Sequence, residues 1–204
     1  MIQIYDNSTG HIIANIDGKR MLVDTGAAKT FYDEYQGVRI DDLSRMLGQP
    51  LDGVLGMDSI KAKVLSITRD SINFNAVAPD HEGAPLKYIC GIPCVDIKIN
   101  EVPCCAVIST GAATSYISEE LISRDKYTRS VNDSHPHYGN FPVKMFVNYY
   151  SISNKNYFAD AGELPAEFTL LSFAGVDAII GTDVLDRFDL IMDFSDNRLH
   201  LISN

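Results

Sequence analysis

Short runs of alternating apolar and polar positions dominate the chain, and most come in pairs separated by a polar turn. Residues 11–24 (HIIANIDGKRMLVD) contain two such runs around Asp17-Gly18, a dipeptide typical of two-residue hairpin turns. The same arrangement recurs in residues 63–74, 95–108 and 189–201. The pattern therefore predicts a mostly β protein built from hairpins.

Helical periodicity is scarce, and it is confined to residues 40–47 and 119–124. Residues 75–91 contain two prolines, two glycines and little periodicity, which is typical of a connection between larger units. We therefore predict an N-terminal lobe over residues 1–80, a linker over 81–91 and a C-terminal lobe over 92–204.

Two sequence elements occur twice, in the same order. The segment MLVDTGAAKTF (residues 21–31) returns as AVISTGAATSY (106–116), and LDGVLGMDSI (51–60) returns as VDAIIGTDVL (176–185). Each half therefore has an apolar strand, a Thr-Gly-Ala-Ala turn and a second apolar strand that ends in Gly-x-Asp. This repetition predicts two halves of similar structure, related by an internal duplication.

The repeated turn has the composition of a catalytic loop. After the strand, Gly26 lets the backbone turn sharply, which places the carboxylate of Asp24 at the tip of the turn. The hydroxyl of Thr25 can form a hydrogen bond to the opposing loop. The later strand can pass close beneath the turn because its glycine has no side chain.

This duplicated motif resembles the aspartic peptidases of the retropepsin and pepsin clan, over nearly the whole chain. The resemblance implies an all-β fold of two pseudo-symmetric retropepsin-like β-barrel lobes, with a cleft between them that binds a peptide or protein. In that family two carboxylates share a proton and activate a water. The resemblance assigns the two catalytic loops and their supporting glycines to Asp24, Thr25, Gly26 and Gly56, and to Ser109, Thr110, Gly111 and Gly181.

The sequence departs from the family pattern at Ser109, where the second carboxylate is expected. The chemistry needs one ionised carboxyl as base and one protonated carboxyl as acid, and a serine hydroxyl does not titrate in this range. Because general acid–base catalysis contributes about 10²–10⁴-fold, we expect weak or absent peptidase activity. The alternative is an active aspartic endopeptidase, with a degenerate dyad or with two Asp24 residues paired in a dimer. We expect Asp24 and Ser109 to face each other across the cleft.

The two halves differ in the length available for a flap, the hairpin that closes over substrate in this family. From position 24 to position 56 is 32 residues, whereas from 109 to 181 is 72. We therefore predict a flap in the C-terminal lobe, with returning strands over 141–152 and 157–168, and no equivalent hairpin over the cleft between residues 31 and 51. The predicted substrate-binding residues at the flap tip are Tyr138, Gly139, Asn140 and Phe141.

Composition narrows the function classes. Of the 204 residues 46% are hydrophobic and 22% charged, enough to form a core and unlike a disordered chain. The formal charge of −10 and the lack of a Lys/Arg cluster argue against a nucleic-acid partner. Since neither a membrane-spanning run nor a signal-peptide pattern is present, we expect a cytoplasmic protein without a membrane partner, secretion being the alternative if a leader was removed. We expect a monomer, with a homodimer as the alternative.

The remaining polar candidates favour structural roles, so we expect neither a metal nor a cofactor. The four cysteines do not match a paired C-x2-C zinc pattern, and adjacent side chains on a strand point to opposite faces. We predict free thiols, with a disulfide from Cys90 or Cys94 to one of the adjacent pair as the alternative. The adjacent pair is Cys104 and Cys105. Two histidines in the flap region, His135 and His137, are interpreted as loop residues, and Asp58 and Asp183 as structural caps.

Overall fold

The computed structural model describes residues 2–6, 8–80, 82–168, 171 and 173–204. The N-terminal half, up to residue 80, contains β1 (Ile2–Asp6), β2 (Ile13–Ile16), β3 (Lys19–Val23), β4 (Glu34–Tyr35), β5 (Val38–Arg39), α1 (Ile40–Leu47), β6 (Gly53–Leu55), α2 (Met57–Ile60), β7 (Val64–Ile67) and β8 (Ser71–Asn73). As predicted, strands dominate.

The C-terminal half, from residue 82, contains β9 (Ala84–Ile89), β10 (Ile92–Ile99), β11 (Val102–Ile108), β12 (Tyr116–Ile117), β13 (Tyr127–His135), β14 (Gly139–Ile152), β15 (Lys155–Glu163), β16 (Ala178–Ile180), β17 (Phe188–Asp193) and β18 (Arg198–Ser203). Short 3-10 turns are interspersed among the described residues at Glu119–Leu121, Arg124–Lys126, Ala166–Phe168 and Thr182–Asp186. In the described parts of the chain, no helix has the length and apolar character needed to cross a membrane.

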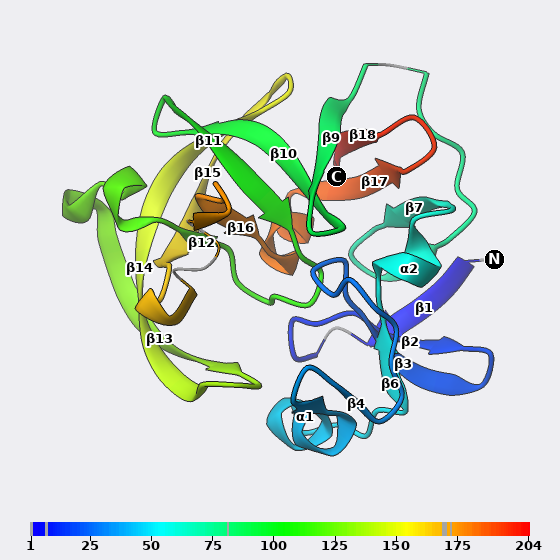
Figure 1. The fold of residues 1–204 in the computed structure, drawn as a ribbon. Helices are drawn as coiled ribbons and strands as arrows, with labels where there is room; N and C mark the ends of the chain where they lie inside the picture. Colours follow the sequence, from blue (N-terminus) through cyan, green and yellow to red (C-terminus); the bar gives the residue numbers. More distant parts are fainter. Residues whose placement is uncertain (1, 7, 81, 169–170, 172) are drawn as a thin grey trace.

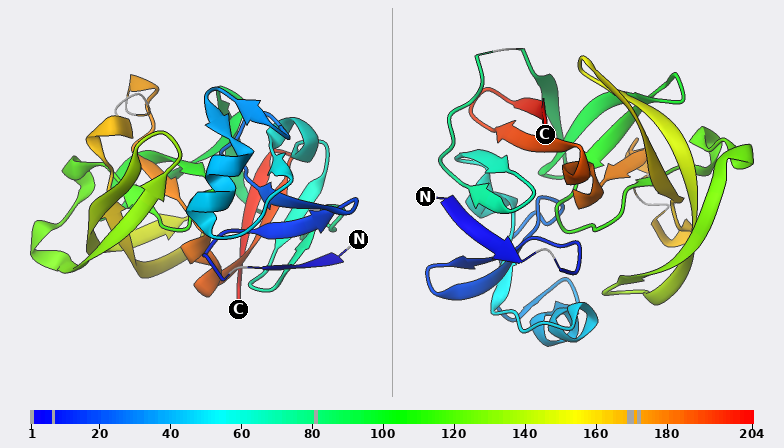
Figure 2. Two further views of the ribbon diagram at one scale, coloured as in Figure 1. Left: turned by 90° about the horizontal axis from the view of Figure 1, so that it is seen from below. Right: turned by 180° about the vertical axis from the view of Figure 1, so that it is seen from behind.

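One sheet of 16 strands runs through both halves, in the order β13-β14-β15-β12-β16-β11-β10-β9-β18-β17-β7-β8-β1-β2-β3-β6. Its middle joins the two halves, because β17 pairs antiparallel with β7 and β18 pairs antiparallel with β9. The C-terminal strands β17 and β18 therefore lie between β9 and β7 (Figure 1), and Figure 2 shows the same ribbon from two further sides. The largest cluster of buried side chains also spans both halves.

The segment predicted as an irregular linker contains a strand. β9 pairs with β10 on one side and β18 on the other, and it buries Ala84 and Leu86. The two prolines and two glycines of this region obscured that short alternation, since only Pro85 lies within the strand. Residue 81, where the predicted linker begins, lies outside the described residues. The division into lobes stays a prediction.

Each half pairs its two repeated strands in parallel. β3 pairs with β6, placing Val23 opposite Leu55, and β11 pairs with β16, placing Ile108 opposite Ile180. The residue that follows each first strand makes an equivalent hydrogen bond. The amide of Asp24 donates to Leu55 O, and the amide of Ser109 donates to Ile180 O, both at 3.0 Å. The repetition in sequence is thus a repetition in structure.

The helix predicted over residues 40–47 is α1. Its apolar residues recur at the spacing of one helical face, and they pack on the N-terminal strands. Gly48 ends the helix in the left-handed region at φ 66°. The buried contacts of α1 are made by Ile40, Leu43 and Leu47 against Ile13, Leu22 and Val54.

A long hairpin is present in the C-terminal half, as predicted. It consists of β13 and β14, whose paired residues run from Tyr127 and Phe146 to His135 and Gly139. The hairpin tip, residues 136–138, approaches the N-terminal half near β4 and α1 (Figure 1). A Cβ placed on Gly37, between β4 and β5, would lie 3.7 Å from Cε1 of His137.

The prediction of no equivalent hairpin between residues 31 and 51 is wrong, because a short hairpin there lines the same cavity as the tip of the long one. β4 and β5 pair through Glu34 opposite Arg39 and Tyr35 opposite Val38. The turn between them needs only Gln36 and Gly37, both with positive φ (51° and 81°), as in a type I′ turn. The prediction assumed strands of ordinary length, whereas β4 and β5 have two residues each and fit into the short interval.

Candidate active site

The two repeated turns meet at the interface of the halves and bind each other through their threonines. Thr25 Oγ1 donates to Ile108 O (2.7 Å), and Thr110 Oγ1 donates to Val23 O (2.8 Å). Each hydroxyl also accepts from the opposite backbone: Thr25 N lies 3.0 Å from Thr110 Oγ1, and Thr110 N lies 3.1 Å from Thr25 Oγ1. Both side chains are buried. These four bonds fix the relative position of the two turns.

Asp24 lies at the centre of this arrangement. Its Oδ1 accepts from the amides of Gly26 (2.7 Å) and Gly111 (3.0 Å) and lies 3.4 Å from Oγ of Ser109, which donates to it. Burial raises the pKa of the Asp24 carboxyl, and the hydrogen bonds from Gly26, Gly111 and Ser109 oppose that shift. The position equivalent to Asp24 in the second turn therefore holds a hydroxyl donor.

Two glycines make this close approach possible. A Cβ on Gly111 would lie 2.2 Å from Cγ of Asp24, and a Cβ on Gly26 would lie 2.4 Å from Oγ of Ser109. Neither position has room for a side chain, so each turn presents bare backbone to the functional group of the other.

The glycines of the supporting strands hold the turns from beneath. The amide of Gly56 donates to Thr30 Oγ1, and the amide of Gly181 donates to Ser115 Oγ, both at 3.0 Å. A Cβ would lie 2.5 Å from the Lys29 carbonyl at Gly56 and 2.7 Å from Ala112 O at Gly181. The strands pass this close because they have no side chain there.

The aspartates after these glycines cap the turns. Asp58 Oδ1 accepts from both the amide and the hydroxyl of Thr30 at 2.8 Å. Asp183 accepts from the amide of Ser115 at 2.8 Å and from its hydroxyl at 2.6 Å. Both carboxylates face the backbone of their own half, which agrees with a structural role.

A cavity of about 600 Å³ opens above Asp24 and Ser109. Its N-terminal wall is apolar and comes from the strands, α1 and β5. The side chains of that wall are Leu22, Phe31, Val38, Leu43, Met46, Leu47 and Val54. The opposite wall combines the flap hairpin with Ile92, Val107, Leu171 and Ile179. An apolar pocket with a few polar groups on its floor is the usual form of a ligand site.

The predicted flap residues divide into two groups. Tyr138 and Phe141 line the cavity. Gly139 begins β14 at the turn, and Asn140 accepts a hydrogen bond at 2.7 Å from the hydroxyl of Ser134. Neither Gly139 nor Asn140 is among the cavity-lining residues.

Sequence reasoning missed several residues that line the cavity. On the flap these are Asp133, Ser134, His135, Pro136 and His137, and on the N-terminal half they include His11, Tyr35 and Gln36. The Gln-Gly turn was a usable signal for the last two, since Gly after a polar residue favours a tight hairpin. Nothing in the local pattern around His11 indicated its position.

Aromatic rings pack around His135 at the flap tip. The His135 ring stacks on Tyr138, with centroids 4.7 Å apart, and meets Phe168 edge-on at 4.9 Å. Burial lowers the pKa of His135 to about 4. The neighbouring Asp133 accepts a hydrogen bond from the hydroxyl of Tyr116. The tip is thus packed around a neutral imidazole.

The cysteines are free thiols, as predicted. Cys94 and Cys104 are buried, and burial raises the pKa of each to about 12. Cys90 is exposed and lines the cavity. Within the described ranges, no three Cys, His, Asp or Glu side chains form a group suited to a metal ion.

Comparison with known proteins establishes the fold. No family model matches the chain, and no curated protein matches it. Among solved structures, the aspartic proteinase from Irpex lacteus is similar with a TM-score of 0.63 at 9% identity, over 100% of this chain and 97% of that one. The EIAV protease complexed with the inhibitor HBY-793 matches at 18% identity over 54% of this chain and 92% of that one, with a TM-score of 0.34. The first match shows that this protein has the all-β, two-lobed aspartic-proteinase fold.

Proposed function

We propose that the protein binds peptides in the cavity between its halves and hydrolyses them weakly or not at all. The observation that carries this proposal is the hydroxyl of Ser109 at 3.4 Å from Asp24, in the place where the repeat calls for a second carboxyl. The fold supports a peptide ligand by analogy, and the site itself supports the loss of activity.

The cavity suits an extended peptide. Its volume of about 600 Å³ lies within the usual range for ligand sites, and its N-terminal wall offers apolar surface to side chains. The flap tip covers it from the C-terminal half, where Tyr138 and His137 are exposed at the cavity edge. A bound peptide would thus lie between the Asp24 floor and the flap.

The expected weak hydrolysis follows from the two side chains at the bottom of the cavity, Asp24 and Ser109. Peptide hydrolysis needs a base to activate water and an acid to protonate the leaving nitrogen. Asp24 can serve as one of these, whereas Ser109 donates a hydrogen bond without titrating. The closest neighbours of the carboxylate therefore stabilise its charge and supply no second proton.

The dimer alternative has less support. Asp24 is enclosed by both turns of one chain, and the buried bonds between Thr25 and Thr110 hold those turns together. Two Asp24 carboxylates from different chains would meet only if these bonds broke. The single-chain site is therefore the better basis for the function.

We also infer that the two halves descend from one duplicated unit. A second pair of equivalent contacts supports this inference: the Arg20 amide donates to Asp52 Oδ2 at 2.7 Å, and the Cys105 amide donates to Asp177 Oδ2 at 2.9 Å. Sequence analysis gave no role to these two aspartates. Each fastens the strand before its turn to the supporting strand.

A binding experiment tests the proposal. A fluorescent peptide library is titrated with the native chain, with Tyr138→Ala and with Tyr127→Ala. Tyr138 lines the cavity, whereas Tyr127 is a similarly exposed tyrosine on β13 that does not (46% and 52% exposed). We expect binding to weaken at least about tenfold for Tyr138→Ala alone, in line with the loss of one aromatic contact. Absence of peptide binding, or equal effects of the two variants, would overturn the proposal.

A further inference from the structure

His11 lies on the loop between β1 and β2 and lines the same cavity as Asp24 and Ser109. Its side chain is an ionisable group in the same cavity as Asp24, whose side-chain hydrogen-bond donor, Ser109, does not titrate. Three features of the structure bear on what it does there: how its loop is held, how its ring is oriented, and which charges surround it.

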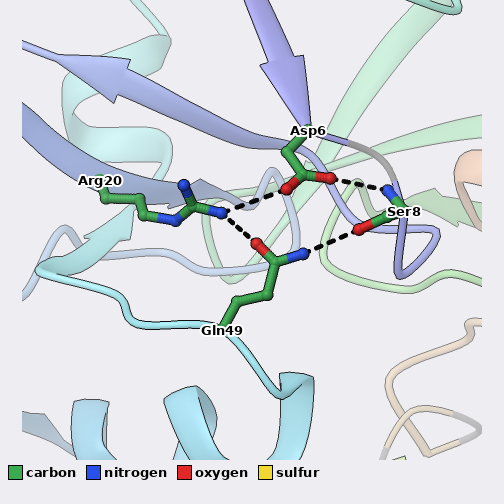
Figure 3. A network of polar contacts seen from close by, with 4 residues as sticks. All are labelled: Asp6, Ser8, Arg20 and Gln49. Atoms are coloured by element: carbon green, nitrogen blue, oxygen red, sulfur yellow. Dashed lines mark hydrogen bonds and ion pairs between the residues drawn. The ribbon is translucent and has the colours of Figure 1, made fainter.

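A polar network anchors the start of this loop (Figure 3). The Ser8 amide donates to Asp6 Oδ1 at 2.9 Å, and the Ser8 hydroxyl accepts from Gln49 Nε2 at 2.8 Å. The Arg20 guanidinium donates to Asp6 Oδ2 at 3.2 Å and to the amide oxygen of Gln49. The loop is thereby tied to β1, β3 and the segment after α1.

The end of the loop packs on the C-terminal half. Gly10 O accepts a hydrogen bond from the Thr182 hydroxyl, and a Cβ on Gly10 would lie 2.8 Å from Cβ of Ala113. Gly10 also has a φ of +78°, which glycine adopts readily. The loop, which belongs to the N-terminal half, therefore contacts the C-terminal half immediately before His11.

The ring of His11 has a defined orientation. Its Nδ1 lies 3.0 Å from Thr9 O, and because a carbonyl only accepts, Nδ1 carries the hydrogen. In the neutral ring Nε2 is then the nitrogen that can take up a proton. His11 and Asp24 both line the cavity of about 600 Å³ in which a peptide would bind.

Charge couples the two side chains. Asp24 from the first turn and Asp133 from β13 are the charged groups that act on His11, and both favour its protonated form. Burial raises the pKa of Asp24 and lowers the pKa of His11, so the two pKa values move toward each other. Two such groups can share one proton, which leaves one as base and the other as acid.

We propose that His11 is the acid–base partner of Asp24 in residual peptide hydrolysis, in place of a second carboxyl. The inference rests on the proposed function, since it concerns a peptide bound in the same cavity. Asp24 carboxylate takes a proton from water as the water oxygen bonds to the peptide carbonyl carbon and the C=O electron pair moves to oxygen. Protonated His11 gives its Nε2 proton to the leaving nitrogen as the C–N bond breaks and the C=O bond re-forms. The products are a carboxylic acid and an amine, and transfer of the proton from Asp24 to His11 restores the pair.

A kinetic experiment tests this role. Hydrolysis of a peptide that the native chain binds is measured with the native chain, His11→Gln, Ser109→Asp and the double variant, each checked for folding by circular dichroism. We expect His11→Gln to lower kcat about 10²-fold with unchanged peptide binding. In the Ser109→Asp chain, which has a second carboxyl, the same change should lower kcat less than about 3-fold. Equal effects in both backgrounds, or no effect in the native chain, would overturn the role of His11.

A titration that needs no activity provides a second readout. The His11 ring is followed by NMR in the native chain and in Asp24→Asn, with Asp17→Asn, in the exposed β2–β3 turn, as the charge-matched control. We expect only Asp24→Asn to lower the pKa of His11, because it removes a negative charge that favours the protonated ring. An unchanged pKa would overturn the coupling. A chain that binds peptide but never cleaves it would overturn this inference and leave the proposed function intact, whereas a chain that binds no peptide would overturn the proposed function.

Discussion

Ser109 Oγ lies 3.4 Å from Oδ1 of Asp24, although 85 residues separate the two positions in the sequence. The backbone around them is nearly symmetric, because each turn donates and accepts the same threonine hydrogen bonds. The functional groups on that symmetric frame differ: a carboxyl that titrates faces a hydroxyl that does not. The chemistry of the site follows from this difference.

The threonine bonds should contribute strongly to stability. We expect Thr25→Val and Thr110→Val each to lower the free energy of unfolding by about 1–3 kcal/mol, because each leaves a buried amide and a buried carbonyl without their partner. Chemical denaturation measures the effect. Thr128→Val on the exposed part of β13 is the control, and we expect a change within about 0.5 kcal/mol. Losses at Thr25 and Thr110 no larger than at Thr128 would contradict the interlocked turns.

Gly111 should be intolerant of a side chain for one identifiable reason. A Cβ there would lie 2.2–2.4 Å from the Asp24 carboxyl atoms, so we expect Gly111→Ala to cost about 1–3 kcal/mol of stability and to weaken peptide binding. Replacing Asp24 with alanine removes the carboxyl that the new Cβ would contact, so the substitution at Gly111 should then be tolerated better. Gly111→Ala should therefore cost much less in an Asp24→Ala chain, as a double-mutant cycle would show. An additive result would mean that the close contact is absent in solution.

The sequence was sufficient to predict the fold class, the repeated turns and α1, because each has a strong local signal. Two copies of a Thr-Gly-Ala-Ala turn, each followed by its own Gly-x-Asp strand, predicted the repeated turns, and the structure adds that their strands pair in parallel, β3 with β6 and β11 with β16. The apolar spacing at residues 40, 43 and 47 likewise specifies a helix, whose end is marked by Gly48.

Other features depend on contacts between distant segments and had no local signal. β9 is a strand because β10 and β18 flank it, whereas Pro85 and the prolines and glycines around the strand favour a loop. β4 and β5 are too short for periodicity to identify them. The loop that carries His11 is held by residues far away in the sequence, since Gln49 bonds to Ser8 and Thr182 bonds to Gly10.

The flap tip should loosen in acid. The folded chain protonates His135 only near pH 4, whereas an unfolded chain does so near 6.5, so the unfolded chain binds more protons between these values. Stability from this residue is thus present above about pH 6.5 and lost as the pH falls toward 4. We expect hydrogen exchange at the β13–β14 tip to accelerate over this range in the native chain.

His135→Phe keeps an aromatic ring against Tyr138 and Phe168 but cannot be protonated. We expect this variant to lose most of the acid dependence at the tip. His137→Phe, on the exposed side of the same turn, is the control: it removes only the smaller, charge-based contribution to the lowered pKa of His135 and should keep most of the acid dependence. Identical acid dependence in the native chain and in His135→Phe would contradict a half-buried, neutral imidazole at the tip.

The most direct measurement compares peptide hydrolysis by the native chain and by Ser109→Asp at equal concentration, with Asp24→Ala in each background. A second carboxyl beside Asp24 should restore a pair whose ionisations are split by repulsion, so we expect Ser109→Asp to be faster by about 10²-fold or more. Its rate should peak on the acidic side of neutrality and be lost with Asp24→Ala. Efficient hydrolysis by the native chain that Asp24→Ala abolishes, that Ser109→Asp does not accelerate and that is independent of protein concentration would contradict the claim that Ser109 limits this site.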